Sequence, residues 1–452
     1  MTKLVLAPIS RISGQLKIEL EIEGGKVLQT KVGGTTVRGI EKMLKGHDPR
    51  DAQLLTQRIC GICPVGHGVA ATQALEKACD TVIPENARVI RNLLLGANFL
   101  YTNINHFYQI AAPDYFQNLP LAPYIPGPTI IPPLPTQVNS ALSQHFFLSL
   151  EVGRTIQEMV AVFGGKMPHP AALVPGGVTE NVDAQKVTAF YSRLMKVEEF
   201  IRNIYIPDVQ TLAQYNPQEW TYGAGTSNFL SLGAFPLQKK VQGLQNLFLY
   251  SGRYINGQLA EADAEKIKED SRYAWYEEDT FGIEKAGAYS WVKAPRYEGQ
   301  VYEVGALARM LIQENAVVKA LGRKAFSNMG RHMARAEESR LLAEALKGWL
   351  NELEPGKPVS TKLNLKPLTQ GAGEIEAPQG AMIHRLEVKN GVIHNYQIIA
   401  PATWNASPRD DQGKPGALEQ ALIGTPVADI NNPLEVYRVI RSFDLCLSCA
   451  SH

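Results

Sequence analysis

The feature that most constrains this chain is a pair of C-x-x-C motifs near its opposite ends. Cys60 and Cys63 form the first pair, Cys446 and Cys449 form the second, and Cys79 stands alone. A C-x-x-C turn places two sulfur atoms on one side, where they can bind one metal ion. A redox dithiol explains one such motif but not two, and five cysteines are too few for a disulfide scaffold in 452 residues. We therefore expect the fold to bring both ends of the chain together at a metal.

The spacing alone favours a structural zinc site of four cysteines that joins the two ends of the chain. Two observations weigh against this interpretation. Structural zinc sites usually lie on exposed turns, whereas both cysteine pairs have apolar sequence neighbours. The second pair also lies at the end of the sequence, where a free terminus normally frays. A zinc clip therefore stays open as an alternative to a functional metal centre.

Charge and hydropathy argue against several classes of function. The 45 basic and 44 acidic side chains give a net charge of +1, so neither nucleic acid nor an anionic membrane surface is an expected partner. No apolar run approaches the ~18 residues of a membrane-spanning helix. The N-terminal stretch lacks the pattern of a secretory signal, so we expect any export to depend on a partner.

Residue periodicity predicts a mostly α fold with small β-elements, of the α+β class. Alternation over residues 16–22 predicts an N-terminal β-element at about 1–35, and Asn390-Gly391 predicts a late hairpin at about 381–400. A helical core is predicted at about 84–350, with helices at 84–104, 140–163, 184–204, 303–321 and 327–350. We expect the two β-elements and both cysteine motifs, including the C-terminal one at 444–452, to converge on one face.

Motifs along the whole chain resemble those of nickel–iron hydrogenase large subunits. RICGICP at 58–64 and DLCLSCASH at 444–452 resemble the two cysteine motifs of that family. Further matches follow in the family's order: VRGIE at 37–41, GGKMPHP at 164–170 with PGGV at 175–178, and TWNASPRD at 403–410. The last two are most similar to uptake-type members, although this chain is shorter than most of those. The resemblance implies one large-subunit domain, 1–452, with a long-helix bundle, and reversible heterolytic cleavage of H2 into protons and electrons.

The resemblance also implies which residues bind the metals. Cys60 and Cys446 would be terminal ligands of nickel, while Cys63 and Cys449 would bridge nickel to iron. The iron would also carry carbon monoxide and two cyanides. Soft thiolates suit a redox-active nickel, and strong-field diatomic ligands keep iron low-spin.

A magnesium ion is implied near this centre. Its ligands would be the side chains of Glu41 and His452 and the backbone carbonyl of Ile398, because hard oxygen ligands suit this cation. His67 would donate a hydrogen bond near a bridging sulfur, and the alternative is an ordinary buried histidine. Cys79 matches no motif and is interpreted as a small buried apolar residue.

Several positions that line the family's active site differ in this chain. Ser13 stands where a glutamate relays protons from a nickel-bound cysteine, and a serine hydroxyl does not titrate near neutrality. Ala402 stands where a serine or threonine donates to a cyanide. Asp444 and Pro378, in contrast, keep the identities that the family's pattern predicts.

Gln379 and Thr102 form a further pair of differences. Gln379 replaces an arginine that overhangs the open nickel–iron position, and Thr102 replaces the aspartate that pairs with this arginine. Losing the arginine alone would leave a buried carboxylate unpaired, at a cost of several kcal/mol. We therefore interpret the two replacements as coupled.

The resemblance also implies partners. An iron–sulfur small subunit would take the electrons, because this chain has no cysteines left for a cluster. Maturation proteins would insert the iron's ligands, a protease would remove a C-terminal extension, and a dimer of heterodimers stays open. We expect assembly in the cytoplasm, followed by residence there or, through a partner, at the outer face of a membrane.

Two further functions are kept as alternatives. The first is an H2-sensing subunit with little turnover, because changed residues around the metals are compatible with sensing. The second is a quinone-site subunit of respiratory complexes, although members of that group lack the four cysteines.

Overall fold

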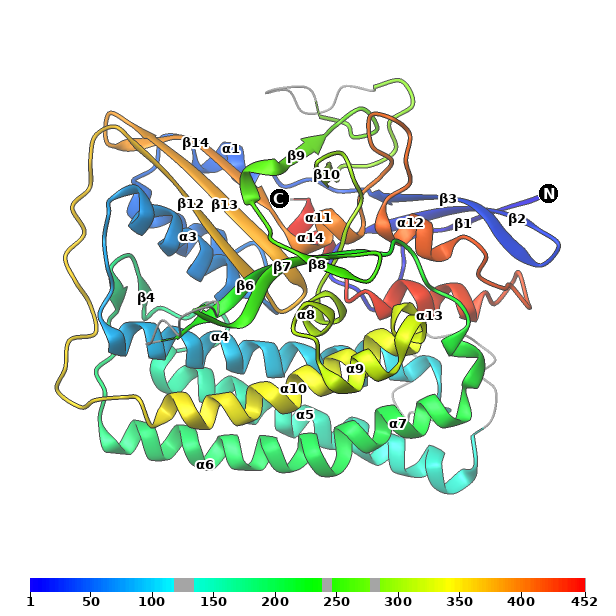
Figure 1. Cartoon of the computed structure of the whole chain (residues 1–452), viewed down its shortest axis with the longest axis horizontal. Helices are drawn as coiled ribbons and strands as arrows, with labels where there is room; N and C mark the ends of the chain where they lie inside the picture. The colour runs from blue at the N-terminus through cyan, green and yellow to red at the C-terminus, as the bar shows by residue number, and fades with distance from the viewer. Residues whose placement is uncertain (118–133, 238–245, 277–284, 452) are drawn as a thin grey trace.

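The computed structural model describes residues 1–117, 134–237, 246–276 and 285–451, and these form an α+β fold. Figure 1 shows a layer of long helices along one side of the molecule, with small sheets and shorter helices on the other. The layer contains α4 (Glu85–Asn105), α5 (Thr136–Gly164), α6 (Ala184–Phe200), α7 (Ile206–Tyr215) and α10 (Asn328–Leu350). The predicted fold class, mostly α with small β-elements and a long-helix core, is confirmed.

Four of the five predicted helices are present, and their ends follow local signals. α4 begins after Pro84, and α10 begins after Ser327, whose hydroxyl accepts a hydrogen bond from the backbone N–H of Gly330. The single helix predicted at 303–321 is wrong. The chain there forms β11 (Glu303–Val304), α8 (Ala306–Ile312) and α9 (Ala316–Ala320). Asn315 separates the two helices, because its side chain caps α9.

The N-terminal sheet consists of three antiparallel strands within the predicted β-element. They are β1 (Thr2–Leu6), β2 (Leu16–Glu23) and β3 (Lys26–Gly34), paired in the order β1-β2-β3. The apolar residues of β2 at positions 16, 18, 20 and 22 are buried and belong to one core with residues of α12 (Ala417–Leu422) and α13 (Leu434–Ser442). The two ends of the sequence therefore share a core.

The predicted late hairpin is present as β13 (Gly380–Lys389) and β14 (Val392–Ile399). A third strand, β12 (Thr369–Ala377), pairs with β13 and was missed. β12 packs on α3 (Pro64–Ala78), and a Cβ atom at Gly373 would lie 1.9 Å from the carbonyl oxygen of Ala70. Glycine is needed for this approach, and the same glycines hide the alternating pattern of a strand.

The helical core predicted at 84–350 is wrong over residues 228–304, which contain strands. β6 (Asn228–Pro236), β7 (Leu247–Ile255) and β8 (Gln258–Ala260) form a sheet in which β11 pairs with β6 in parallel. β9 (Ile267–Asp270) pairs with β10 (Ala294–Tyr297). β6 is buried on both faces, so its sequence lacks the polar alternation by which strands are recognised.

Short elements complete the described chain. They are α1 (Ile40–Leu44), α2 (Ala52–Gln57), β4 (Leu173–Val174), β5 (Gly177–Val178), α11 (Pro401–Asn405) and α14 (Leu447–Ala450). Among the described residues, no helix is both long and apolar enough to span a membrane.

Candidate metal centre

The structure brings the four paired cysteines of the chain into one buried cluster. Their exposed fractions are between 1% and 4%, and their sulfur atoms all lie within 4.8 Å of one another. The sulfur of Cys446 lies 2.8 Å from that of Cys449 and 3.5 Å from that of Cys60. The sulfurs of Cys63 and Cys449 lie 3.4 Å apart. The expected meeting of the two ends at a cysteine cluster is thus present in the fold.

The cluster's electrostatics fit a bound cation. Hydrogen bonds from the other cysteines, that of Cys446 foremost, hold the pKa of Cys60 well below the usual thiol range. Burial raises the pKa of Cys449, and the neighbouring thiol of Cys446 raises that of Cys63. Four crowded sulfurs cannot all ionise alone, whereas a metal cation stabilises thiolates directly. The donor set therefore suits a thiophilic metal.

Backbone contacts fasten the N-terminal segment to the C-terminal cysteine motif. Ser13 and Cys446 form a parallel bridge, and the carbonyl oxygen of Ser13 accepts a hydrogen bond from the N–H of Leu447 at 2.7 Å. The hydroxyls of Ser13 and Ser448 lie 3.1 Å apart. A Cβ at Gly14, where φ is +90°, would lie 2.6 Å from the backbone nitrogen of Ser448. The glycine permits this close approach.

Arg38 joins both cysteine motifs, and no role was predicted for it. Its guanidinium donates to the carbonyl oxygen of Ile59 at 2.7 Å and also to that of Ser448. Its backbone N–H donates to the carbonyl oxygen of Ser451 at 3.0 Å. The VRGIE motif contains Arg38 and could have indicated its importance, but the sequence pattern predicted a function only for Glu41, the glutamate of this motif.

Two of the three predicted magnesium ligands lie together. The carboxylate of Glu41, in α1, accepts a hydrogen bond from the backbone N–H of Ile398 at 2.6 Å. Lys293 also lies 3.8 Å from this carboxylate. The third predicted ligand, His452, lies outside the described residues.

A small cavity lies beside the cysteine cluster and gathers most of the residues that differ from the family's pattern. It is lined by Ser13, Ile62, Thr102, Asn105, His106, Ile110, Gln379, Asp444, Leu445 and Cys446. The hydroxyl of Thr102 donates to the carbonyl of Asn98 in its own helix. The side-chain oxygen of Gln379 is buried and has no hydrogen-bond partner within the described residues. Burial raises the pKa of Asp444 to about 6, although the charge of Arg335 opposes this shift.

A buried arginine supports the loop that carries Gln379. Arg309 donates to the carbonyl oxygen of Pro378 at 2.8 Å, and it pairs with Glu376 at 2.7 Å and with Glu338 at 2.5 Å. Burial raises the pKa of Glu376 to about 7, against the charge of Arg309. Sequence reasoning missed this network, because its members are distant in sequence.

The remaining predicted residues lie close to the cluster in the fold. His67 lies one helical turn after Cys63 in α3 and shares a hydrogen bond of 3.1 Å with His384, whose other nitrogen lies 2.9 Å from the hydroxyl of Tyr396. Ala402 is buried in α11, which packs on α14. The structure thus offers a structural hydrogen bond for His67, and its predicted role near a bridging sulfur stays a prediction.

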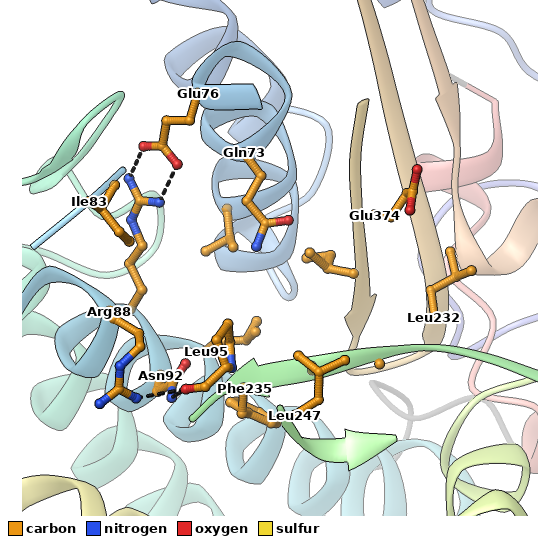
Figure 2. Close-up of a pocket in the computed structure, with 16 residues that line it drawn as sticks. Gln73, Glu76, Ile83, Arg88, Asn92, Leu95, Leu232, Phe235, Leu247 and Glu374 are labelled. Atoms are coloured by element: carbon orange, nitrogen blue, oxygen red, sulfur yellow. Dashed lines mark hydrogen bonds and ion pairs between the residues drawn. The ribbon is translucent and has the colours of Figure 1, made fainter. Parts of the chain in front are cut away.

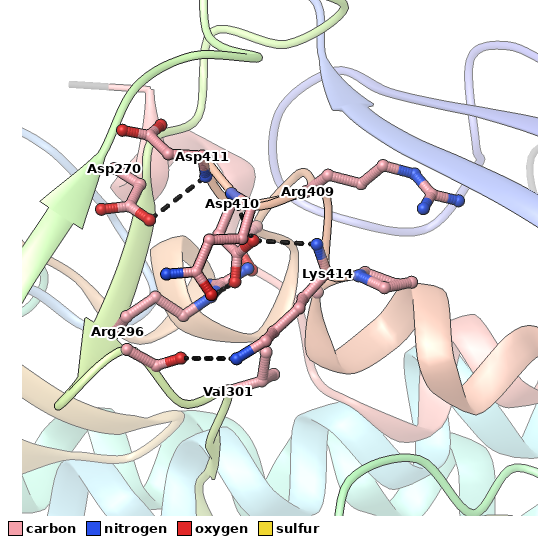
Figure 3. A network of polar contacts seen from close by, with 12 residues as sticks. Asp270, Arg296, Val301, Arg409, Asp410, Asp411 and Lys414 are labelled. Atoms are coloured by element: carbon pink, nitrogen blue, oxygen red, sulfur yellow. Dashed lines mark hydrogen bonds and ion pairs between the residues drawn. The ribbon is translucent and has the colours of Figure 1, made fainter.

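The TWNASPRD motif contributes to structure through its last residue. Figure 3 shows Arg296 against Asp410, and these side chains form a buried ion pair of 3.1 Å. The same carboxylate accepts a hydrogen bond from the backbone N–H of Lys414 at 2.8 Å. These contacts order the chain that follows α11.

A second pocket lies between α3, α4, β6 and β12, and it contains none of the predicted site residues. Glu76 lines this pocket (Figure 2), and its carboxylate accepts two hydrogen bonds from the guanidinium of Arg91, of 2.9 and 2.6 Å. Glu76 also accepts from the N–H of Gly176 at 2.7 Å. These contacts tie α3 and α4 to the PGGV segment.

Comparison with known proteins identifies the family. Residues 38–129 and 119–452 match the family described as nickel-dependent hydrogenase. The chain belongs to the nickel-dependent hydrogenases. It is 37% identical to the periplasmic [NiFeSe] hydrogenase large subunit of Desulfomicrobium baculatum, over 100% of this chain and 95% of that protein. It is 32% identical to the hydrogenase-2 large chain of Escherichia coli K12, over 100% of this chain and 97% of the relative.

Solved hydrogenase structures have the same fold. The reduced Ni-Fe-Se hydrogenase of D. vulgaris Hildenborough superimposes with a TM-score of 0.94 at 40% identity, covering 100% of both chains. The reduced, active enzyme of Desulfomicrobium baculatum gives a TM-score of 0.95 at 37% identity. The names of these relatives include selenium, whereas this hydrogenase has cysteine at all four positions of its cluster. The predicted hydrogenase large subunit, an oxidoreductase, is confirmed, and the similarity does not favour the H2 sensor.

Proposed function

We propose that this large subunit cleaves H2 reversibly into two protons and two electrons at a nickel–iron centre bound by its four clustered cysteines. Cys60 and Cys446 would hold the nickel as terminal ligands, and Cys63 and Cys449 would hold both nickel and an iron that would carry carbon monoxide and two cyanides. The observation that carries this proposal is the burial of four sulfurs within 4.8 Å of one another. The bound centre supplies the redox chemistry and the place where H2 is activated.

The protein's own part in the reaction concerns the proton. The sulfur of Cys446 is the proposed base, because this residue lines the cavity that also contains Ser13. The hydroxyl of Ser13 lies 3.1 Å from the hydroxyl of Ser448, and neither hydroxyl titrates near neutrality. A proton therefore finds no ready acceptor along this direction, which supports slow proton exit as the limit on turnover.

The other described residues that line the cavity surround the proposed metal position without an arginine or lysine side chain. Gln379 and Thr102 cover the proposed open metal position with neutral side chains, and Asp444 lines the same cavity. Pro378 is proposed to lie beside this position, on the loop that Arg309 supports. Ala402 cannot donate a hydrogen bond to a cyanide, so this ligand is expected to be less strongly held by the protein.

A magnesium ion is proposed between Glu41, the carbonyl of Ile398 and His452. The support is the 2.6 Å contact that already joins Glu41 to the backbone of Ile398. His67 is proposed as a hydrogen-bonding residue beside the bridging sulfur of Cys63, one helical turn away.

Electrons are proposed to pass to the iron–sulfur clusters of a small subunit, the partner that a hydrogenase large subunit implies. Maturation proteins and a C-terminal processing protease are proposed to assemble the centre in the cytoplasm. The mature enzyme then resides there or, through a partner, at the outer face of a membrane. A dimer of heterodimers is compatible with this scheme.

The test is metal analysis, infrared spectroscopy and H2 oxidation with an artificial electron acceptor, all on the purified complex of both subunits. We expect one nickel and one iron per large subunit, infrared bands of carbonyl and cyanide, and turnover. A cluster filled with zinc would contradict the proposal. The complete centre without turnover would instead favour an H2 sensor.

A further inference from the structure

Two buried histidines lie beside the cavity that contains Cys446 and Ser13. His106 begins the π-helix His106–Ala111 and lines the cavity itself, while His332 lies in α10. Their exposed fractions are 1% and 2%, and their rings stack with centroids 5.7 Å apart and an interplanar angle of 25°. The pair therefore extends from the cavity into the protein.

The hydrogen bonding of His106 fixes its tautomer. Its Nε2 lies 2.6 Å from the carbonyl oxygen of Arg441, which can only accept, so Nε2 carries the hydrogen. Burial lowers the pKa of His106 and of His332, and the charge of Arg335 acts in the same direction. Both rings are therefore neutral near pH 7, and Nδ1 of His106 is a bare acceptor.

Three ring nitrogens of the pair lack a hydrogen-bond partner within the described part of the chain. They are Nδ1 of His106 and both nitrogens of His332. Buried polar atoms are nearly always satisfied by protein groups or by ordered water. The stacked rings present faces to each other, and Phe107 packs edge-on against His332 with ring centroids 6.0 Å apart. Water has the paired donor and acceptor character that these atoms require.

We propose that His106 and His332 hold buried water molecules that carry protons away from the cavity. The inference rests on the H2 chemistry proposed above and names the route that Ser13 alone does not provide. One water contacts Nδ1 of His106 and the bare nitrogen of His332, and a second contacts the N–H of His332. A proton that arrives on the first water passes to the bare nitrogen. The opposite N–H then gives its proton to the second water, so the ring stays neutral overall in the other tautomer.

The charged groups around His332 disfavour a protonated ring, so they favour the transfer of a proton through His332 over its retention there. Arg331 and Arg335 lie in the same helix; Arg331 pairs with Glu303 at 2.8 Å, and Arg335 donates to the carbonyl oxygen of Ser442 at 2.6 Å. Asp444 also lines the cavity, and its carboxyl interacts with the charge of Arg335. The positive charges of Arg331 and Arg335 both disfavour a proton on His332, so it moves on rather than accumulating.

The test compares His332→Phe with His332→Gln in the purified complex of both subunits. Phenylalanine keeps a ring but removes both nitrogens, whereas glutamine keeps polar atoms that can hold water. We expect the Phe variant to oxidise H2 about tenfold more slowly or worse, as for loss of a positioned proton carrier, with a larger solvent deuterium isotope effect. The Gln variant should be slowed as well, because an amide can hold the water but cannot take up a proton on one atom and release a proton from another. His394→Phe changes an exposed histidine of β14 and is the matched control.

A high-resolution crystal structure gives a readout that does not depend on turnover. It should show water at about 2.7–3.2 Å from Nδ1 of His106 in the unmodified complex, and that water should be lost in His332→Phe. His332→Gln should keep this water while slowing turnover, and it covers a failure of the Phe variant to fold.

The outcomes separate the route from the function. An active complex whose rate and isotope effect are unchanged in His332→Phe and His332→Gln overturns the proton route, as does a dry histidine pair. An unmodified complex that lacks nickel or H2 oxidation overturns the proposed function instead, while the crystallographic water still decides whether the histidine pair binds water.

Discussion

The cysteine cluster follows the sequence pattern of the family, whereas the cavity beside it departs from that pattern. The cluster keeps all four thiols that its family's metal chemistry requires, and each is almost completely buried. The cavity has lost its expected glutamate, arginine and aspartate and is lined instead by Ser13, Gln379 and Thr102. The cysteines follow the family's pattern, whereas Gln379 and Thr102 replace an expected pair of opposite charges by neutral side chains. The difference teaches which positions can vary without loss of the centre.

Cys63→Ser tests most directly whether the clustered cysteines bind the metals. Serine is a poor ligand for soft metals, so we expect nickel content to fall below about a tenth and H2 oxidation to be lost. Metal analysis and activity of the purified complex measure both. Cys79→Ala is the control, because Cys79 is buried but is not one of the four clustered cysteines, so this variant should retain nickel and activity. Full nickel in Cys63→Ser would refute the bridging assignment.

The coupling of Thr102 and Gln379 is tested by restoring the lost charges. Thr102→Asp places a second buried carboxyl beside Asp444 and should destabilise the protein by about 3–5 kcal/mol. Adding Gln379→Arg should recover at least half of that loss, measured as a double-mutant cycle of thermal unfolding. Thr102→Val loses only the hydrogen bond to Asn98 and should cost about 1 kcal/mol. Additive effects in the cycle would contradict the coupling.

The network behind the cavity predicts a pH dependence of stability. Because burial raises the pKa of Glu376 from 4.5 to about 7, the folded protein holds a proton that the unfolded chain releases. The stabilisation is fully present below about pH 4.5 and is lost as the pH rises through about 7, by roughly 1.4 kcal/mol per unit of pKa shift. The melting temperature should therefore fall as the pH rises from 5 to 8, and Glu376→Gln should remove the part of this fall that Glu376 causes. Glu374→Gln, on the same strand, should keep it.

The smallest expected effect concerns Ser13. Ser13→Glu supplies a group that can titrate and swing, so H2 oxidation and H/D exchange should both rise by about tenfold or more, equivalent to ~1.4 kcal/mol of barrier. The infrared spectrum should stay the same, which serves as the control for an intact centre. Unchanged rates with an unchanged spectrum would show that proton exit is not limiting, and would leave the histidine route as sufficient.

Local sequence signals predicted the elements whose causes are themselves local. Pro84 and Ser327 mark the starts of α4 and α10, and Asn390-Gly391 marks the late hairpin. β6 and β12 were missed for reasons that lie outside their own segments. β6 is covered on both faces by other elements, and β12 needs its glycines because α3 approaches so closely.

The sequence by itself predicted the four cysteines that cluster in the fold, because two C-x-x-C motifs in a chain of this family leave few other thiols to choose from. It also identified Ser13, Thr102 and Gln379 as departures, since a motif position can be compared residue by residue. Only the tertiary structure decided what stands around them. Arg38 and Arg309 act through carbonyl groups, which every residue has and no motif reveals. Such contacts exist only once distant segments have packed, so they carry no signal in the linear chain.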